Sequence, residues 1–290
     1  MGQRAPAQSY TAANSTPQPG LGICLLHHGL GLENTQFPRP TQPATILAPI
    51  LLALRIVVAA ALIPVGERSE EHLFPEGVAL VTRSEGADAW ELFPEELRAM
   101  ARATLARQRE FALGRRCARE ALALLGGPRG AIPVGRFRDP VWPFGYVGSI
   151  AHCQGFCAVA AARTLPSSGY PAIRGLGLDS ERAVSLSEEL VGVVCSAKEC
   201  EWLASRQGDG LPWDRLFFCA KKSAYKCLFP TTHHFLEFRD MGVRFDAGHG
   251  AFDVTLPSLY GAPSHLFGRY LIRNGLVLSA TTWMEESACP

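Results

Sequence analysis

The chain has 290 residues, of which 47% are hydrophobic and 19% are charged. This composition is typical of a globular protein with a substantial core, and the length allows one large domain or two small ones. The formal net charge of +1 argues against a partner held by bulk charge, such as nucleic acid, although it allows a local basic cluster.

The N-terminal part of the chain differs in composition from the rest. Residues 1–44 are rich in Gln, Pro, Thr, Ser and Ala without a hydrophobic period, which predicts disorder. Residues 45–65 form an apolar run of about the length that spans a bilayer, roughly 20 residues. Arg55 lies in its middle, and such a charge costs about 2.5–3.5 kcal/mol at a bilayer centre, which disfavours insertion. Three interpretations stay open for 45–72: a membrane anchor, a packed apolar helix with its linker, or an extension upstream of the functional chain.

The first half of the compact region is predicted to span residues 73–168. Residues 73–83 alternate like a strand, and residues 94–126 carry apolar side chains at helical spacing before Gly126 and Gly127. Residues 146–163 indicate a turn followed by an apolar strand.

The second half is predicted to span residues 169–284, after a linker at 167–171. Its expected elements are a strand at 173–181, one or two helices within 185–205, a helix at 213–230 that Pro230 ends, and strand-like pieces at 235–246, 251–256 and 268–284. An Asn-Gly pair divides the last piece into two strands. Each half thus has strands and one major helix, which predicts an α+β chain of two similar halves.

The nine cysteines are scattered, without a CxxC pair or a Cys-His spacing typical of zinc sites. Several lie inside apolar runs, which favours small buried side chains in a reducing compartment. We therefore expect a cytoplasmic protein.

Two acidic residues, Asp179 and Glu181, lie at the end of the predicted strand at 173–181. Residues two apart on an extended segment point to the same side. Two carboxylates on one side can hold a hard cation such as Mg²⁺, with phosphate and water oxygens completing the coordination. The alternative is an acidic strand end without a ligand.

Two further groups of residues have the chemistry of phosphate binding. Arg115 and Arg119 share one face of the predicted helix at 94–126, and guanidinium groups suit phosphate oxygens. Ser149 and His152 lie in a Gly-containing stretch, where a hydroxyl and an imidazole can face a phosphate. The alternatives are a solvated basic face and a polar turn.

These pieces together are more specific than each alone. The stretches GRRCAR (114–119), PVWPFGYVGSIAHC (140–153), GLGLDSE (175–181) and FCAKKSAYK (218–226), in this order, resemble the 4′-phosphopantetheinyl transferases of the Sfp type. The resemblance is greatest to the branch that serves siderophore and polyketide synthesis, and it covers about residues 73–284.

The resemblance implies a fold and an activity. The fold is a pseudo-dimer of two α+β halves, with coenzyme A in the cleft between them, and the fused halves imply a monomer. The activity is Mg²⁺-dependent transfer of the phosphopantetheine arm of coenzyme A to a serine of an acyl or peptidyl carrier protein, with adenosine 3′,5′-bisphosphate as the second product.

The resemblance also implies roles for individual residues. Asp179 and Glu181 match metal ligands. Glu199 matches an acidic residue that deprotonates the acceptor serine, and Lys226 matches a lysine that stabilises or protonates the leaving phosphate. The residues that match positions holding the phosphates of coenzyme A are Arg115, Arg119, Ser149, His152 and Lys221.

Lys222 departs from the family pattern, because the family has a glutamate at this position as the third acidic metal ligand. The change removes one carboxylate and adds a positive charge near the metal. The lysine could pair with Asp179 or Glu181 and fill the metal's place. Three outcomes stay open: activity with a two-carboxylate metal site, coenzyme A binding with poor transfer, or an isolated change in an otherwise active enzyme.

Overall fold

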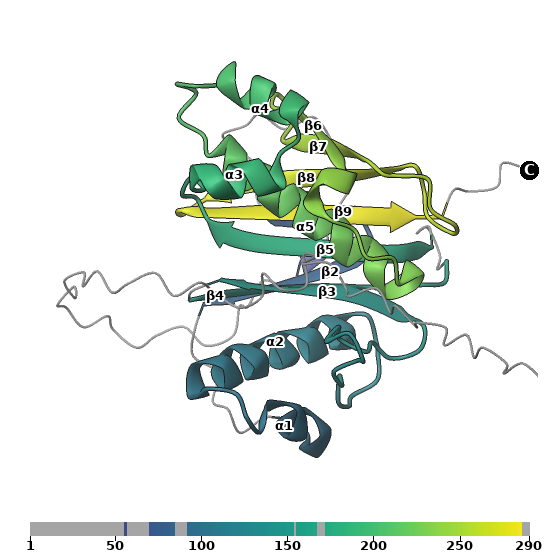
Figure 1. Cartoon of the computed structure of the whole chain (residues 1–290). Helices are drawn as coiled ribbons and strands as arrows, with labels where there is room; N and C mark the ends of the chain where they lie inside the picture. The colour runs from purple at the N-terminus through teal and green to yellow at the C-terminus, as the bar shows by residue number, and fades with distance from the viewer. Residues whose placement is uncertain (1–54, 57–69, 85–91, 154, 167–171, 286–290) are drawn as a thin grey trace, which may run out of the picture.

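A computed structural model describes residues 55–56, 70–84, 92–153, 155–166 and 172–285. It contains two antiparallel sheets and five α-helices within these residues, which confirms the mixed α+β class (Figure 1). The similarity of the two halves to one another stays a prediction. The expected disorder of residues 1–44 lies outside the described residues.

The first sheet has the strand order β1-β2-β4-β3. These strands are β1 (Arg55–Ile56), β2 (Val78–Ser84), β4 (Phe156–Arg163) and β3 (Tyr146–Cys153). The sequence predicted a turn and one strand for residues 146–163, whereas the structure has a hairpin of two strands there. The first of these strands was missed because its small and polar residues, Gly148, Ser149 and His152, weaken the apolar signal.

Residues 94–126 form two helices instead of the predicted single helix: α1 (Pro94–Met100) and α2 (Leu105–Leu124). The side chain of Thr104 begins α2, because its hydroxyl accepts a hydrogen bond from the Arg107 backbone N–H at 3.3 Å. The Gln108 amide donates to the Met100 carbonyl at 3.2 Å and holds the two helices at the break.

The second sheet has the strand order β5-β9-β8-β7-β6. Its strands are β5 (Ile173–Arg182), β9 (Leu276–Met284), β8 (His265–Arg273), β7 (Ala251–Thr255) and β6 (Gly242–Asp246). Asn274 and Gly275 both have positive φ, at 52° and 73°, and form the predicted tight turn between β8 and β9. Of the predicted piece at 235–246, only the end is a strand, and Phe238–Asp240 (η5) is a 3₁₀ turn.

Three helices accompany the second sheet: α3 (Glu188–Val194), α4 (Ala197–Ala204) and α5 (Trp213–Thr232). Residues 185–205, where one or two helices were predicted, contain the first two. The third continues two residues past Pro230, which therefore lies in its last turn and does not end it. The helix ends at His233, whose backbone is left-handed with φ 54°.

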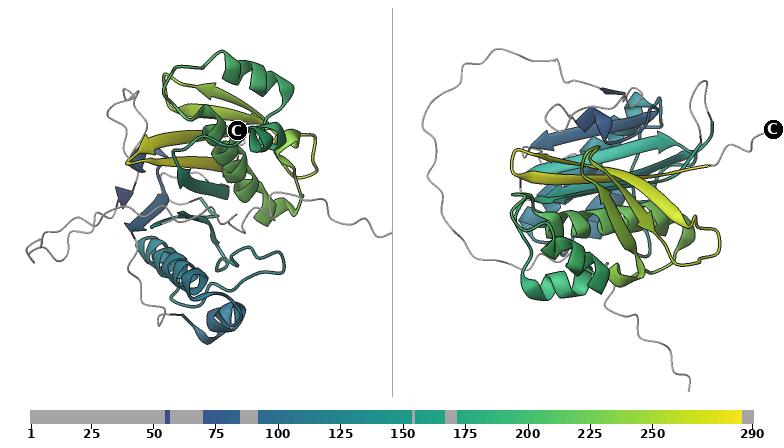
Figure 2. Two further views of the ribbon diagram at one scale, coloured as in Figure 1. Left: turned by 60° about the vertical axis from the view of Figure 1, so that its left-hand side comes forward. Right: turned by 90° about the horizontal axis from the view of Figure 1, so that it is seen from above.

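The helices and sheets form stacked layers. Helix α2 covers the outer face of the first sheet, the two sheets face one another, and α5 packs against the second sheet (Figures 1 and 2). Strand β4 alternates between layers: Cys157, Val159 and Ala161 face α2, whereas Ala158 and Ala160 face the second sheet. These small side chains allow the two sheets to pack closely.

The apolar run at 45–65 is described only at Arg55 and Ile56. These two residues pair with Leu80 and Ala79 of β2 as an edge strand. In the part of the chain that the structure describes, no helix combines the length and the apolar character needed to cross a membrane. The rest of this run lies outside the described residues.

Strand β5 has different neighbours on its two sides. Leu176 and Leu178 belong to the core between the sheets. Gly175 and Gly177 point to the opposite side, where α5 passes so closely that a Cβ at Gly177 would lie 1.7 Å from the Ser223 carbonyl oxygen. The helix can approach the strand only because these positions have no side chain.

Gly177→Ala should therefore destabilise the protein strongly. The contact is with backbone, which cannot rotate away, so we expect a loss at or above the upper end of the usual overpacking range, about 1–3 kcal/mol. Gly192→Ala in α3 is the control, since a Cβ there meets nothing within 4 Å and alanine favours a helix. Thermal or urea unfolding measures both variants, and equal stabilities would contradict the close contact.

Candidate functional site

Charged side chains continue the glycine row of β5. Asp179 and Glu181 follow Gly175 and Gly177 at intervals of two, so they face α5 as well. Lys222 and Lys226 lie four residues apart on α5 and face back toward the strand. The carboxylate–lysine cluster is defined here as Asp179, Glu181, Lys222, Lys226 and Arg215.

The two carboxylates of this cluster are paired with three cations. Lys222 Nζ lies 2.8 Å from Glu181 Oε1 and 3.2 Å from Asp179 Oδ1. Lys226 Nζ lies 2.9 Å from the same Asp179 oxygen, and an Arg215 nitrogen lies 3.7 Å from Glu181 Oε2. The Lys222 ammonium thus bridges the two acidic residues.

Two members of these ion pairs, Asp179 and Lys222, are buried. The side chain of Asp179 is 2% exposed and that of Lys222 is 9% exposed. Burial by itself would raise the pKa of Asp179, but the charges of Lys222 and Lys226 outweigh it and hold this pKa below its usual value. Burial would likewise lower the pKa of Lys222, but Asp179 and Glu181 outweigh it and raise this pKa. The two groups are therefore charged at neutral pH.

The donor set does not fit a divalent metal in this arrangement. An ammonium nitrogen bridges Asp179 and Glu181, where a cation shared by both carboxylates would bind. Within the described residues, no group of three or more His, Cys, Asp or Glu side chains is arranged to hold a metal ion. Unit charges about 4 Å apart interact by about 4 kcal/mol at an effective dielectric constant of about 20, so Lys222 and Lys226 would oppose a divalent ion strongly.

Glu199 and Lys221 form a separate buried pair on another face of α5. Lys221 Nζ lies 2.6 Å from Glu199 Oε2 and donates to the Val194 carbonyl at 2.8 Å. The other Glu199 oxygen accepts from the Val243 N–H at 2.8 Å. The Lys221 side chain is fully buried. This pair ties α4, α5 and β6 together and lies outside the carboxylate–lysine cluster.

Arg115 and Arg119 are held by the protein itself. Arg119 donates to both oxygens of Glu96 at 3.0 Å, and Glu96 also accepts from the Ile132 N–H at 2.8 Å. Arg115 Nε donates to the Ile132 carbonyl at 2.7 Å and stacks over Phe111. Burial lowers the pKa of Arg115 to about 10, so its charge is retained at neutral pH.

Ser149 and His152 both lie on β3 but have different surroundings. The buried Ser149 hydroxyl accepts a hydrogen bond from the Leu178 N–H at 2.9 Å and so joins the first sheet to β5. The His152 ring contacts Arg107 and lies 3.7 Å from Glu110, on α2. The structure therefore places Ser149 next to the carboxylate–lysine cluster and His152 beside a basic helix.

A basic hollow of about 470 Å³ lies at one end of the sheets. Arg83, Arg182 and Arg273 line it from the ends of β2, β5 and β8, and its acidic lining residue is Glu70. A volume of this size suits a small-molecule ligand, and Arg182 and Arg273 favour an anionic one, whereas Arg83 is paired with Glu120 at 2.7 Å. Arg182 directly follows Glu181, so this hollow borders the same end of β5.

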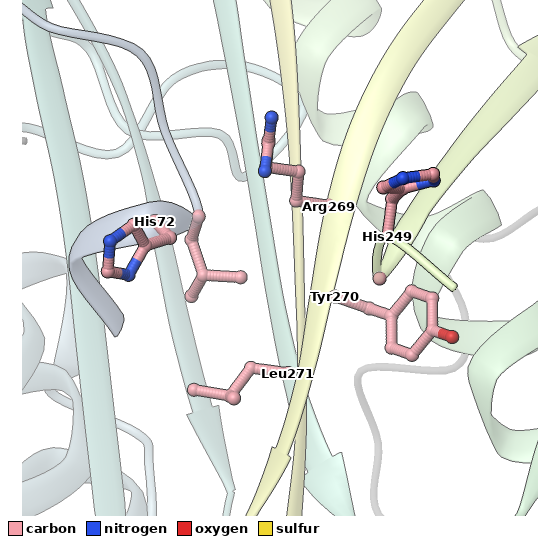
Figure 3. A pocket seen from close by; sticks show the side chains of 7 residues that line it. His72, His249, Arg269, Tyr270 and Leu271 are labelled. Atoms are coloured by element: carbon pink, nitrogen blue, oxygen red, sulfur yellow. The ribbon is translucent and has the colours of Figure 1, made fainter. Parts of the chain in front are cut away.

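A second cavity, of about 10 Å³, lies between His72 and strand β8 (Figure 3). It is lined by Arg269, Tyr270 and Leu271 and has room for one water molecule at most. This cavity is too small for a ligand site.

Sequence reasoning missed three residues that shape the candidate site. Arg215 lies two turns before Lys222 on α5. Phe218 lies under the Lys222 ammonium, with 4.6 Å between the nitrogen and the ring centroid. Helical spacing from Lys222 would have found both. Glu96 lies far from the motifs in sequence and gave no signal.

Removing the Glu96 carboxylate should unfold the region around α2. Glu96→Ala leaves the Arg119 charge and the Ile132 N–H without their partner, so we expect a loss of about 3–5 kcal/mol of stability. Glu95→Ala is the control, because Glu95 is exposed and makes only a 3.9 Å surface pair worth about 1 kcal/mol or less. Urea unfolding measures both, and a small effect at Glu96 would contradict its role as anchor.

The comparisons with known proteins agree with this architecture. Residues 94–162 match the model of the 4′-phosphopantetheinyl transferase N-terminal domain, and residues 175–267 match the model of the 4′-phosphopantetheinyl transferase superfamily. The chain is 34% identical to the 4′-phosphopantetheinyl transferase Npt of Nocardia iowensis, over 73% of this chain and 99% of the relative. It is 40% identical to the transferase Svp of Streptomyces mobaraensis, over 65% of this chain and 77% of that protein.

A third relative is the 4′-phosphopantetheinyl transferase PptT of Mycobacterium tuberculosis, which is 34% identical over 64% of this chain and 84% of its own length. The matched regions include α2, β3, β5 and α5, which carry the site residues described above. The chain therefore belongs to the 4′-phosphopantetheinyl transferase superfamily and is an enzyme of that class.

Proposed function

We propose that the protein transfers the phosphopantetheine arm of coenzyme A to a serine of an acyl or peptidyl carrier protein, with the carboxylate–lysine cluster at the reacting phosphate. The observation that carries this proposal is the position of Lys226. Its ammonium contacts Asp179 at 2.9 Å, the Leu178 carbonyl at 3.0 Å and, across the sheet junction, the Ile150 carbonyl at 3.4 Å. A cation between the two halves suits the diphosphate of a ligand bound there.

The transfer has a simple balance of bonds. The serine hydroxyl oxygen forms a bond to the phosphorus that carries the pantetheine arm. The P–O bond to the second phosphate breaks, and its electron pair leaves with adenosine 3′,5′-bisphosphate. The serine proton passes to a base or to water. Fixed positive charges at Lys222 and Lys226 would stabilise the negative charge that develops on the phosphoryl oxygens and the leaving group.

Three of the five residues that the sequence indicated for phosphate binding keep that role in the proposal. We assign His152, beside Arg107 of α2, to the phosphates of coenzyme A together with Arg115 and Arg119. The internal bonds of these two arginines favour a rigid basic face on α2. For Ser149 and Lys221, whose hydrogen bonds lie inside the protein, we propose positioning of the sheet junction and of α5. The basic hollow beside Arg182 further supports an anionic co-substrate.

Magnesium dependence, with Asp179 and Glu181 as ligands, stays a prediction from the sequence. An ion bound by both would require the Lys222 ammonium to leave two carboxylates that it contacts at 2.8 and 3.2 Å. We therefore assign no step of the transfer to a metal. The same contacts favour a second candidate function, a coenzyme A-binding protein with weakened transfer.

The setting of the enzyme is proposed on the family alone. A cytoplasmic monomer that modifies carrier proteins of siderophore or polyketide synthesis fits the resemblance in the four motifs. Carrier proteins of this kind are expected to be acidic around the modified serine, so basic groups of the enzyme would steer their association.

A transfer assay by mass spectrometry tests the proposal. Wild-type protein should add the mass of one phosphopantetheine arm to an apo-carrier protein. Lys226→Met should slow loading by about 10²–10³-fold, because it removes a positive charge next to the negative charge that develops on the phosphate. Lys198→Met, at an exposed lysine of α4, should load at the wild-type rate. If wild type binds coenzyme A without loading the carrier, the second candidate function replaces the first.

Glu199 has two candidate roles that pH dependence separates. The resemblance implies a base for the serine proton, whereas its bonds to Lys221, the Ser196 N–H and the Val243 N–H favour positioning of α4 against α5. We expect Glu199→Gln to lower both the melting temperature and the transfer rate, with the shape of the pH–rate profile unchanged. The control is Glu201→Gln, at an exposed residue of the same helix. Loss of the acidic limb of the profile at an unchanged melting temperature would establish the base.

A further inference from the structure

We propose that Lys222 is a built-in cation that excludes divalent metal from Asp179 and Glu181 and makes coenzyme A binding independent of such a metal; the part concerning coenzyme A rests on the proposed function. The two carboxylates have the chemistry of metal ligands. They lie on one side of β5 and, by residue type and spacing, would form half of a hard-cation site. The cation present between them is an ammonium group of the chain itself.

The ammonium has the contacts of a bridging ion. Its distances to Glu181 and Asp179 are 2.8 and 3.2 Å, and each carboxylate contributes one oxygen. The second oxygen of Asp179 is buried and makes no hydrogen bond within the described residues. Asp179 is therefore neutralised through a single oxygen, which it shares between Lys222 and Lys226.

The Phe218 ring also holds the Lys222 ammonium in place. Lys222 lies over the Phe218 ring at 4.6 Å, and the Arg215 guanidinium lies over the same ring at 5.7 Å. The side chain is 9% exposed. To admit a metal, the Lys222 side chain would have to leave both carboxylates and the Phe218 ring. It would also have to move past the Arg215 guanidinium. A metal ion would then meet the charges of Lys226 and Arg215 without a third carboxylate.

A lysine at this position can still donate a hydrogen bond to a phosphate. An ammonium has three N–H donors, and the two carboxylates account for two of them. The third can donate to an oxygen of the coenzyme A diphosphate. The interaction with the co-substrate then comes from a fixed charge of the chain, and its strength does not vary with the concentration of divalent ions.

Direct metal binding without coenzyme A tests the exclusion. Mn²⁺ is the probe, and electron paramagnetic resonance measures the free ion during titration of wild type, Lys222→Glu and Lys198→Glu. The last variant makes the same charge change at an exposed lysine of α4. We expect Lys222→Glu to bind Mn²⁺ about tenfold or more tightly than the other two proteins. Equal affinity in wild type and Lys222→Glu, or no binding in either, would overturn the exclusion.

Coenzyme A binding by the wild-type protein provides the second measurement and needs no variant. Calorimetric titration with millimolar Mg²⁺ and with a chelator should give dissociation constants within about twofold of one another. An affinity that rises about tenfold or more with Mg²⁺ would overturn the metal independence. If coenzyme A binds in neither buffer, the proposed function fails together with this part, while the Mn²⁺ titration still decides the exclusion.

Discussion

The close approach of α5 to β5 is the contact on which the candidate site depends. At Gly177 the helix backbone comes so near that even a methyl group would overlap the Ser223 carbonyl. The buried hydroxyls of Ser223, Ser279 and Thr281 form a hydrogen-bonded group behind this contact, at 2.8–2.9 Å, and join the helix to β9 as well. Helix and strand are thus fixed in separation and in register, and charged side chains beyond the glycines must face one another.

The second consequence of this geometry is a site shared by both sheets. Strand β5 contacts α5 on one side and the first sheet on the other. The charged side chains at the end of β5 therefore lie close to both halves. The Ser149 hydroxyl and the Lys226 ammonium use this position from opposite directions: the first bonds to Leu178 from β3, and the second reaches the Ile150 carbonyl from α5. Hydrogen bonds between two sheets and one helix thus hold polar groups at the end of β5 in place.

The sequence predicted the periodic parts well and the local exceptions poorly. The strand predicted at 173–181 is β5, and the Asn-Gly pair predicted the turn at Asn274. The helix break at Thr104 and the continuation of α5 past Pro230 were missed, because each depends on single side-chain contacts or on tertiary packing. Among the site residues, Asp179, Glu181 and Lys226 were expected together and lie together. That Glu199 and Lys221 pair with one another could not be read from spacing, since 22 positions separate them.

The buried charges divide into those that hold the fold and those that remain for a ligand. Glu96 with Arg119, and Glu199 with Lys221, are pairs in which the carboxylate also accepts backbone N–H bonds, so most acceptor capacity is used within the protein. The carboxylate–lysine cluster differs, because three cations face two carboxylates. Although Asp179 and Lys222 are buried, Glu181 and Lys226 are partly open, with side-chain exposures of 26% and 17%. The excess positive charge of this partly accessible cluster favours the binding of an anion. A diphosphate supplies it, whereas an added divalent cation would increase the imbalance.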